Sequence, residues 1–292
     1  MIGDNPFIGV SHLSQARARD RIQKLDIERI AGVIDKALSC GASGYTFSIP
    51  HQTNLEILKT LKKEGKTERA FGLYPILPYA EVYVRAANEK GMRGLARDLM
   101  SRLPLGAKAR VLLQGGISAV TFDPIRMLKA YVDMELSSYL SVKPENAELR
   151  TVFLHEVVVD LALSFGLVSI FDSFIEHVHD KYHATPGFVT RNFARFVDFF
   201  HDNISCNDLT IMTPFNRIGF QMNPSRELCE KHLAEFSNGG VFAMSVLAAG
   251  YLSLNDAVEY LRTLSNLSGV AVGVSSPDHA EDTFTKLKTL AS

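Results

Sequence analysis

Short apolar runs that alternate with helical segments place the strongest constraint on the fold of this chain. Each run is followed by a stretch in which apolar residues recur at helical spacing. This alternation is typical of parallel βα units, and it predicts an α/β protein built as a closed (β/α)8 TIM barrel. The predicted strands are residues 7–10, 43–47, 70–77, 151–155, 187–190, 209–212, 241–245 and 270–274.

Length and composition agree with one barrel. The chain has 292 residues, of which 46% are hydrophobic and 22% charged, so it can bury a sizeable core as one domain over residues 1–292. The gap between the third and fourth predicted strands is too long for a simple βα connection. We therefore expect a helical insertion over residues 81–122, which either covers one end of the barrel as a lid or only thickens the outer helix layer.

Charge and cysteine content restrict the partners and the compartment. The 31 basic and 32 acidic residues give a net charge of −1, which predicts no nucleic-acid or membrane partner. Cys40, Cys206 and Cys229 form no metal-binding spacing and suit a reducing compartment. We expect a soluble cytoplasmic protein that acts on a small molecule without a metal ion, and the sequence does not indicate its oligomeric state.

Five runs in the second half of the chain follow one another at barrel spacing. They are TVFLHEV, GFVTRNF, MTPFN, FAMSVLAAGYLS and VAVGVSSPDHAEDTF. Their order resembles the fourth to eighth strands of the aldo-keto reductase superfamily, a TIM-barrel family that binds NADP(H) across the strand ends. The resemblance implies an oxidoreductase-like enzyme with a groove for NADP(H).

The resemblance also implies roles for individual residues. His155 corresponds to the family's catalytic histidine, and Arg191 and Asn192 to the pair that holds the nicotinamide carboxamide. Thr213 or Met212 takes the place of a stacking glutamine. The remaining residues implied for cofactor binding lie in the later loops and are Asn216, Ser245, Leu247, Gly250, Ser275 and Ser276.

The first half of the chain departs from the family's catalytic pattern. Tyr45 stands where the family has Asp, Pro50 or His51 where it has Tyr, and Tyr74 or Pro75 where it has Lys. Without a tuned acid, an alkoxide formed by hydride transfer has no proton source nearby. The chain therefore resembles a diverged member, and we predict no ordinary aldehyde or ketone reductase activity.

Position at strand ends gives the candidate catalytic set, because barrel active sites lie past the C-terminal ends of the strands. We predict that Tyr45, His51, Tyr74 and His155 are catalytic and that they converge with Asn192 on one pocket. The histidines of HVHDKYH fall at the end of a predicted outer helix, so no metal site is expected there.

The helix predicted after the last strand begins with Ser275, Ser276 and Pro277. Its unpaired N–H groups suit a phosphate, whereas the alternative is a simple serine cap that needs no ligand. Asp278 would weaken an anion site unless it points to solvent. Two other functions also stay open: a non-redox lyase or isomerase for a phosphorylated compound, and a catalytically inactive binding barrel.

Overall fold

The computed structural model describes residues 1–9, 26–65, 69–78 and 124–290. The strands in these ranges form one sheet in which every neighbouring pair is parallel. They are β1 (Ile2–Gly3), β2 (Gly44–Ser48), β3 (Phe71–Leu77), β4 (Ala147–Leu149), β5 (Thr151–Leu154), β6 (Thr185–Val189), β7 (Leu209–Pro214), β8 (Gly239–Met244), β9 (Gly269–Val270) and β10 (Val272–Gly273).

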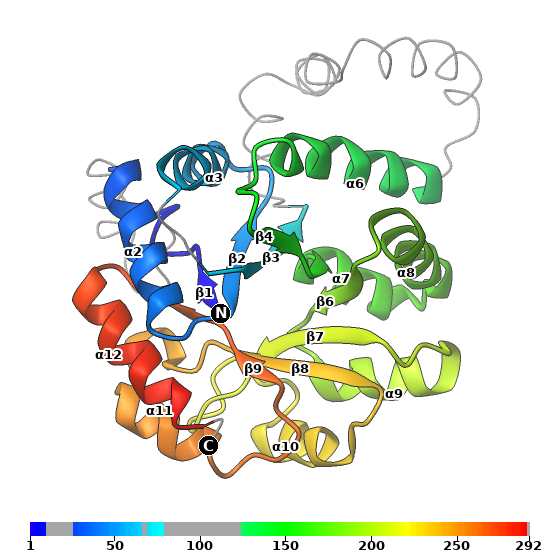
Figure 1. The fold of residues 1–292 in the computed structure, drawn as a ribbon. Helices are drawn as coiled ribbons and strands as arrows, with labels where there is room; N and C mark the ends of the chain where they lie inside the picture. Colours follow the sequence, from blue (N-terminus) through cyan, green and yellow to red (C-terminus); the bar gives the residue numbers. More distant parts are fainter. Residues whose placement is uncertain (10–25, 66–68, 79–123, 291–292) are drawn as a thin grey trace, which may run out of the picture.

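The sheet closes on itself, as the alternating sequence predicted. β4 and β5 are one strand interrupted at Arg150, because both pair with β3. β9 and β10 are likewise separated only by Ala271, with β9 paired to β8 and β10 paired to β1. The strands therefore occupy eight positions around a closed ring, and the predicted (β/α)8 barrel is confirmed (Figure 1).

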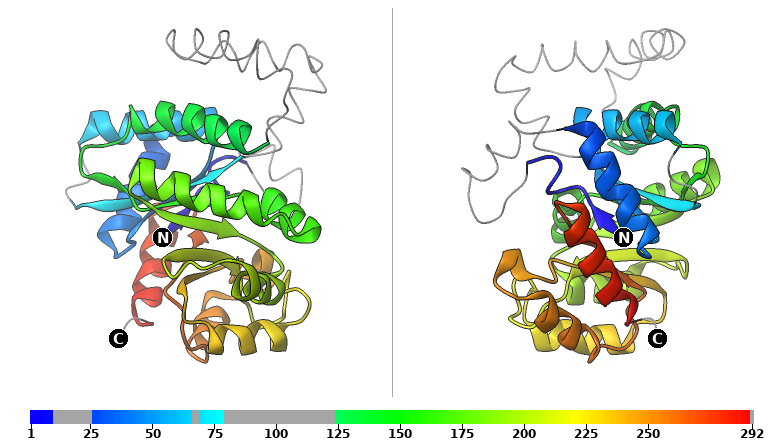
Figure 2. Two further views of the ribbon diagram at one scale, coloured as in Figure 1. Left: turned by 90° about the vertical axis from the view of Figure 1, so that its right-hand side faces the viewer. Right: turned by 60° about the vertical axis from the view of Figure 1, so that its left-hand side comes forward.

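Helices surround the ring on its outside (Figure 1). They are α2 (Ile27–Ser39), α3 (Gln52–Glu64), α6 (Pro124–Leu140), α7 (Glu156–Phe165), α8 (Val168–Tyr182), α9 (Phe193–Asn203), α10 (Arg226–Glu235), α11 (Leu254–Leu261) and α12 (Pro277–Lys288), with a 3₁₀ turn, η1, at Ala248–Gly250. Figure 2 shows α2 and α12 side by side, and Lys36 and Glu281 join them by an ion pair at 2.8 Å.

The first strand was predicted in the wrong place. Residues 7–9 lie in turns, and β1 begins at Ile2 instead. The N–H groups of Phe7 and Ile8 both donate to the carbonyl of Asp4, which folds the chain back after β1. Phe7 and Ile8 are apolar because they are buried beneath this turn, and not because they form a strand.

Side chains alternate between an outer layer under the helices and the barrel lumen. The lumen is filled by Met1, Phe153, Val189 and Met212. Two aromatic rings here cover glycines of the neighbouring strand: a Cβ on Gly187 would lie 2.5 Å from the Phe153 ring, and one on Gly269 2.5 Å from the Phe242 ring. The lumen is thus a packed core, as is usual for this barrel type.

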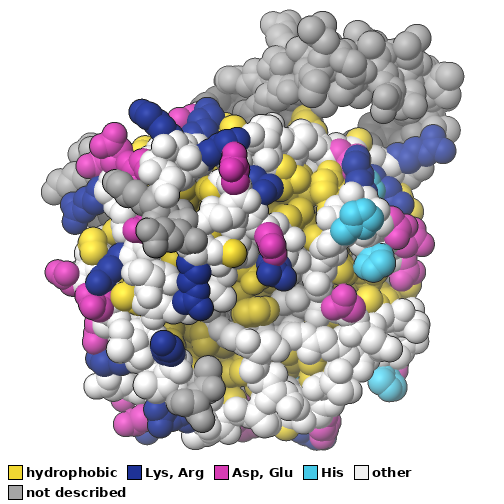
Figure 3. All heavy atoms as spheres, in the orientation of Figure 1, with side chains coloured by type: hydrophobic (Ala, Val, Ile, Leu, Met, Phe, Trp, Pro, Cys, Tyr) yellow, Lys and Arg dark blue, Asp and Glu magenta, His cyan; other side chains and the backbone are white. Residues whose placement is uncertain are grey.

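α6 is fixed to α8 by one carboxylate. Asp133 accepts a hydrogen bond from Tyr182 at 2.7 Å, lies 2.7 Å from His177 Nε2, and forms an ion pair with Lys181 at 2.5 Å. The HVHDKYH run thus ends an outer helix, as predicted, and histidine side chains lie on the surface beside α8 in Figure 3. The predicted insertion at residues 81–122 lies outside the described residues.

Among the helices of the described ranges, none combines the length and the apolarity needed to cross a bilayer.

Candidate functional site

His155 follows β5 directly at the C-terminal edge of the sheet and is the N-cap of α7. Its backbone N–H donates to the carbonyl of Leu77 at the end of β3, at 2.8 Å. Its imidazole Nδ1 accepts a hydrogen bond from the N–H of Val157 at 3.2 Å. A ring nitrogen that accepts is unprotonated, so the neutral imidazole carries its proton on Nε2. The helix thereby fixes both the tautomer and the orientation of the ring.

The protonation state of His155 is set mainly by burial, which lowers the pKa of its imidazole below the ordinary value. Glu156 and Asp160 raise this pKa, while Arg191 lowers it. The net decrease favours the neutral ring near pH 7. Such a ring can donate a hydrogen bond from Nε2–H to an oxygen, but it is not a ready proton donor.

Arg191 lies just after β6 and is held by Glu156 at the start of α7. Its Nε donates to Glu156 Oε2 at 3.1 Å and its Nη2 to Oε1 at 2.5 Å. The two side chains are only 35% and 20% exposed, so this fork-shaped pair is partly shielded from water. The principal partner of Arg191 is thus a carboxylate of this chain, and the cofactor contact expected of Arg191 remains a prediction.

Asn192 is held through its backbone at the same edge. Its N–H donates to Thr190 Oγ1 at 3.0 Å, and that hydroxyl donates to Asp160 Oδ1 at 2.6 Å. Asn192 also precedes α9 as its N-cap residue, but its side chain makes no capping hydrogen bond. The structure therefore brings His155, Arg191 and Asn192 together around the first turns of α7.

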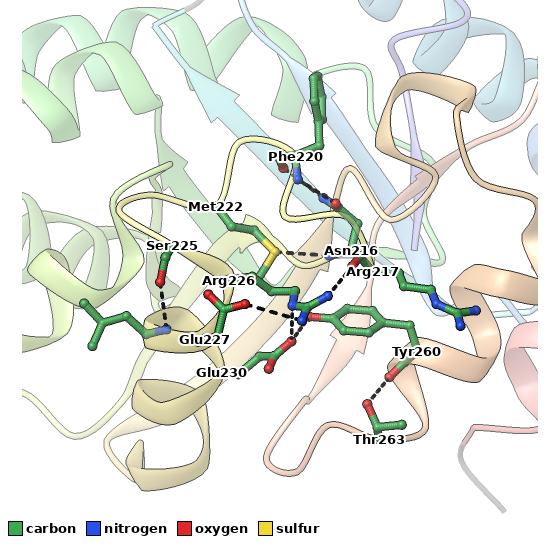
Figure 4. A network of polar contacts seen from close by, with 11 residues as sticks. Asn216, Arg217, Phe220, Met222, Ser225, Arg226, Glu227, Glu230, Tyr260 and Thr263 are labelled. Carbon is green, nitrogen blue, oxygen red and sulfur yellow. Dashed lines mark hydrogen bonds and ion pairs between the residues drawn. The ribbon is translucent and has the colours of Figure 1, made fainter.

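The side chain of Asn216 makes its hydrogen bonds within its own loop. Its Nδ2 donates to the carbonyl of Phe220 at 2.8 Å, and its Oδ1 accepts the N–H of Phe220 at 2.7 Å (Figure 4). The residue is fully buried. Both polar atoms of the amide close the loop after β7, and the role expected of Asn216 in cofactor binding remains a prediction.

The same loop is fixed to the neighbouring helices. Arg226 at the start of α10 donates to the carbonyl of Arg217 and forms an ion pair with Glu230 at 3.3 Å. Tyr260 of α11 donates to Glu230 at 2.8 Å (Figure 4). These contacts join the loop after β7 to α10, and α10 to α11.

The loop after β8 has an uncommon backbone. Ser245, Ala248 and Ala249 have φ angles of 53°, 44° and 59°, and Gly250 follows at 95°. Non-glycine residues rarely adopt this left-handed region, and such strain gathers at functional sites. The loop contains the predicted cofactor residues Ser245, Leu247 and Gly250, and the hydrogen bond from Ala248 N–H to the Ser245 carbonyl keeps it compact.

The helix start after the last strand forms as the sequence predicted. Ser276 is the N-cap of α12, its hydroxyl accepts the N–H of His279 at 3.2 Å, and Pro277 occupies the first turn. Ser275 and Asp278 are exposed. The serine cap is present, and the anion site expected around Ser275 and Ser276 remains a prediction.

Tyr45 faces away from the lumen, so its predicted place in the site is wrong. It lies on β2 in the layer beneath the helices, is fully buried, and stacks on Phe47 with ring centroids 5.0 Å apart. Its hydroxyl donates to Asn54 Oδ1 at 2.7 Å. One member of the predicted catalytic set, Tyr45, therefore lies outside the lumen.

Tyr74 faces the lumen but leans toward the opposite end of the barrel. Its ring covers Gly44 and Gly72, since a Cβ on either glycine would lie 2.6 Å from Tyr74 Cε2. Both glycines precede Tyr74 in the parallel strand register, and its hydroxyl interacts with Ser43, which precedes β2. Burial raises the pKa of Tyr74. The predicted convergence of Tyr74 with His155 at the C-terminal edge is therefore wrong.

His51 lies at the predicted edge, as the N-cap residue of α3, and makes no side-chain capping bond. Its backbone N–H donates to the Tyr139 hydroxyl at 2.6 Å, and that hydroxyl donates to the His51 carbonyl at 3.0 Å. Tyr139 of α6 thus fixes the backbone of His51. The catalytic role expected of His51 remains a prediction.

Asp4 is a buried carboxyl at this edge that the sequence did not single out. Its Oδ2 accepts hydrogen bonds from the Ser48 N–H and from Asn54 Nδ2, both at 2.7 Å. Burial is the largest influence on the Asp4 carboxyl and raises its pKa. The missed signal was an acidic residue directly after a strand, which was hidden because the first strand was expected at residues 7–10.

A cleft of about 110 Å³ lies at the other end of the barrel, where β7 begins. Phe196, Phe200 and Leu209 contribute to its apolar wall, and Cys206 and His201 also line it. Catalytic groups in this fold lie at the C-terminal ends of strands, so this cleft is not the candidate site.

No protein-family model matches the sequence, and none of the curated proteins matches it. Solved structures do match the fold. One is a candidate aldo-keto reductase from Pseudomonas aeruginosa, with a TM-score of 0.56 and 9% identity, over 100% of this chain and 91% of the other. A second structure with the same description and organism has a TM-score of 0.52 and 10% identity, over 91% of this chain and 85% of the other.

The identities are too low to carry an activity from those proteins to this one, but the superposition covers the complete barrel. The order of strand-end motifs in the sequence independently resembles the same family. The chain therefore has the (β/α)8 barrel fold of the aldo-keto reductases.

Proposed function

We propose that this protein binds NADP(H) along the C-terminal edge of the barrel and acts as an oxidoreductase on a small molecule. The observation that carries the proposal is the joint placement of His155 and Asn192 by α7. The contact of His155 Nδ1 with Val157 places the imidazole proton on Nε2, and the Asn192 side chain makes no capping bond. These groups suit a carbonyl oxygen and a carboxamide.

The residues present fit the cofactor in two further places. The strained loop from Ser245 to Gly250 and the start of α12 at Ser276 both lie after the last strands, where barrels commonly bind phosphate. Asn192 would hold the nicotinamide carboxamide. When bound, the nicotinamide would supply or accept a hydride.

His155 would orient the substrate and stabilise negative charge on its oxygen. The Nε2–H group would donate to that oxygen, an interaction that is stronger where water is excluded. Tyr45 is buried outside the lumen with its hydroxyl bonded to Asn54, and Tyr74 leans toward the opposite end of the barrel. The proton for a simple alkoxide would therefore have to come from another source. We therefore expect no steady turnover of simple aldehydes and ketones.

The proposal is tested by isothermal titration calorimetry, in which NADPH, NADH and inorganic phosphate are each titrated into the protein. We expect NADPH to bind and Asn192→Ala to weaken that binding about tenfold, the effect of one lost hydrogen bond. Asn203→Ala, at the other end of α9, is the matched control and should bind normally. Failure of NADPH to bind the wild type contradicts the proposal.

The reaction is tested separately with a panel of simple carbonyls. Steady NADPH-dependent turnover that His155→Ala abolishes would contradict the expected loss of ordinary reductase activity. His155→Asn is the companion variant, because asparagine keeps a capping oxygen for α7 but removes the imidazole donor. NADPH binding without turnover of any tested compound would favour the binding-barrel alternative.

A further inference from the structure

We infer that Asp160 is a positioning residue that holds Asn192 in place through the hydroxyl of Thr190. This inference rests on the proposed function, because it concerns how the chain prepares the edge where NADP(H) is proposed to bind. Asp160 lies on α7, while Thr190 and Asn192 lie between β6 and α9. Asp160 therefore connects two successive βα units.

The direction of the hydrogen bonds supports a relay. A threonine hydroxyl has one proton to donate and lone pairs to accept with. The Thr190 proton is committed to Asp160 Oδ1 at 2.6 Å, so a lone pair of the same oxygen is turned toward the Asn192 N–H at 3.0 Å. Thr190 is fully buried, where water cannot replace either partner. The carboxylate thus fixes the hydroxyl rotor, and the rotor fixes the backbone of Asn192.

Glu156 completes the clamp from the same face of the helix. It precedes Asp160 by one helical turn, and residues with this spacing lie on one side of a helix. Glu156 holds the Arg191 guanidinium by two hydrogen bonds while Asp160 holds Thr190. The residue before Glu156 is His155, which caps the helix. One short helix therefore sets the position of His155 relative to the segment that contains Asn192.

The two carboxylates also act on the imidazole. Glu156 and Asp160 raise the pKa of His155, and Arg191 and burial lower it. Removal of the Asp160 charge should therefore shift the His155 titration to lower pH, and Arg191→Gln should shift it to higher pH. A role limited to packing would not produce shifts of opposite direction.

The test compares Asp160→Ala, Asp160→Asn, Thr190→Val and Thr190→Ser. Thr190→Val removes the hydroxyl at nearly constant shape, whereas Thr190→Ser retains it. We expect Asp160→Ala and Thr190→Val each to weaken NADPH binding about tenfold, the cost of one lost hydrogen bond, and Thr190→Ser to bind within about threefold of the wild type. Asp160→Asn, which keeps an acceptor oxygen, should fall between them.

Coupling distinguishes positioning from general stability. If Asp160 acts through Thr190 and Asn192, then Asp160→Ala should cause little further loss of NADPH affinity in an Asn192→Ala background. If Asp160→Ala and Thr190→Val only lower the melting temperature and leave NADPH affinity unchanged, the inference is overturned. The inference is also overturned if Asp160→Ala lowers NADPH affinity by the same factor in the Asn192→Ala background as in the wild type.

A cofactor-independent measurement separates this inference from the proposed function. Hydrogen exchange of the Asn192 amide should accelerate in Asp160→Ala and Thr190→Val but not in Thr190→Ser, with no ligand present. If the wild type binds no NADPH yet exchange follows this pattern, the proposed function fails and the relay stands. Unchanged exchange in both disruptive variants rejects the relay whatever the cofactor does.

Discussion

Asn54 is the centre of a buried polar network at the ends of β1 and β2. It accepts the Tyr45 hydroxyl at 2.7 Å and donates to Asp4 at 2.7 Å and to the Ser48 carbonyl at 2.8 Å. Asn54 itself has no exposed surface. Each polar group in the network has a hydrogen-bond partner within it, and together these bonds fix the turn between β2 and α3. Loss of any one member leaves a buried polar group without its partner.

Asn54→Leu should therefore destabilise the protein strongly. The substitution leaves the Asp4 carboxyl, the Tyr45 hydroxyl and the Ser48 carbonyl without this partner, and we expect a loss of about 3 kcal/mol or more of unfolding free energy. The measurement is urea denaturation. Asn203→Leu, on the exposed end of α9, is the control and should change stability by less than about 0.5 kcal/mol. Equal effects at both positions would show that the network contributes little.

The Asp4 carboxyl should also make stability depend on pH. Its pKa is raised by burial in the folded state, so the folded protein holds this proton more tightly than the unfolded chain. The protonated Asp4 therefore makes its full contribution to folding stability below the pKa of the unfolded chain, about 3.9. This contribution is lost as the pH rises through the pKa of Asp4 in the folded protein. The stability of the wild type relative to Asp4→Asn should fall over that interval. A constant difference from pH 4 to pH 8 would contradict the raised pKa.

Sequence reasoning reached the strand-end position of His155 but not the orientations of the tyrosines. A strand sends successive side chains to opposite faces, so the face that Tyr45 occupies depends on the register of β2. Tyr74 faces the lumen, yet its ring leans over Gly44 and Gly72, which belong to different strands. The direction of the Tyr74 ring depends on the space that these two glycines leave beside it. Because the glycines are far apart in the sequence, a single sequence does not reveal that they are neighbours.

At the scale of elements, most helix and strand positions follow from local pattern, while their ends do not. Ser276 and Pro277 begin α12 as predicted. α10 follows Asn223 and Pro224, which also favour a helix start, but its N-cap is Ser225, whose hydroxyl accepts the Leu228 N–H at 3.2 Å. Several polar residues near a boundary can serve as a cap, and tertiary packing selects among them.

Substitution by alanine should have opposite effects on stability at two glycines, one in a strand and one in a helix. A Cβ on Gly44 in β2 would lie 2.2 Å from the carbonyl oxygen of Gly72, so Gly44→Ala should force the strands apart and cost about 3 kcal/mol or more. Gly32 in α2 has open space around its Cβ position. Gly32→Ala should stabilise the protein by about 1 kcal/mol, because alanine favours the helix. Thermal and urea unfolding of both variants would test this, and destabilisation by Gly32→Ala would contradict it.

For the whole molecule, the closed ring could be predicted because eight strand signals fill a barrel, although the first was misplaced. The order of the later strands around the barrel could be predicted because strand and helix patterns alternate along the sequence. The exact strands at which the ring closes were not visible, since β1, β9 and β10 have two residues each. Strands so short carry almost no periodicity, and the ring forms there because the rest of the barrel brings their backbones together.

These short strands make the seam between β10 and β1 the expected site of first opening. Val272 N–H donates across it to the Met1 carbonyl at 3.1 Å, whereas β7 pairs with β8 over six residues and with β6 over three. Local openings of a protein require less free energy where fewer backbone pairs and buried contacts must break. The Val272 amide should therefore exchange with deuterium well before the amides of Ile211 and Met212, under conditions where exchange reports stability. Exchange of all three at one common rate would mean that the barrel opens only by global unfolding, and that its closing seam is as stable as its centre.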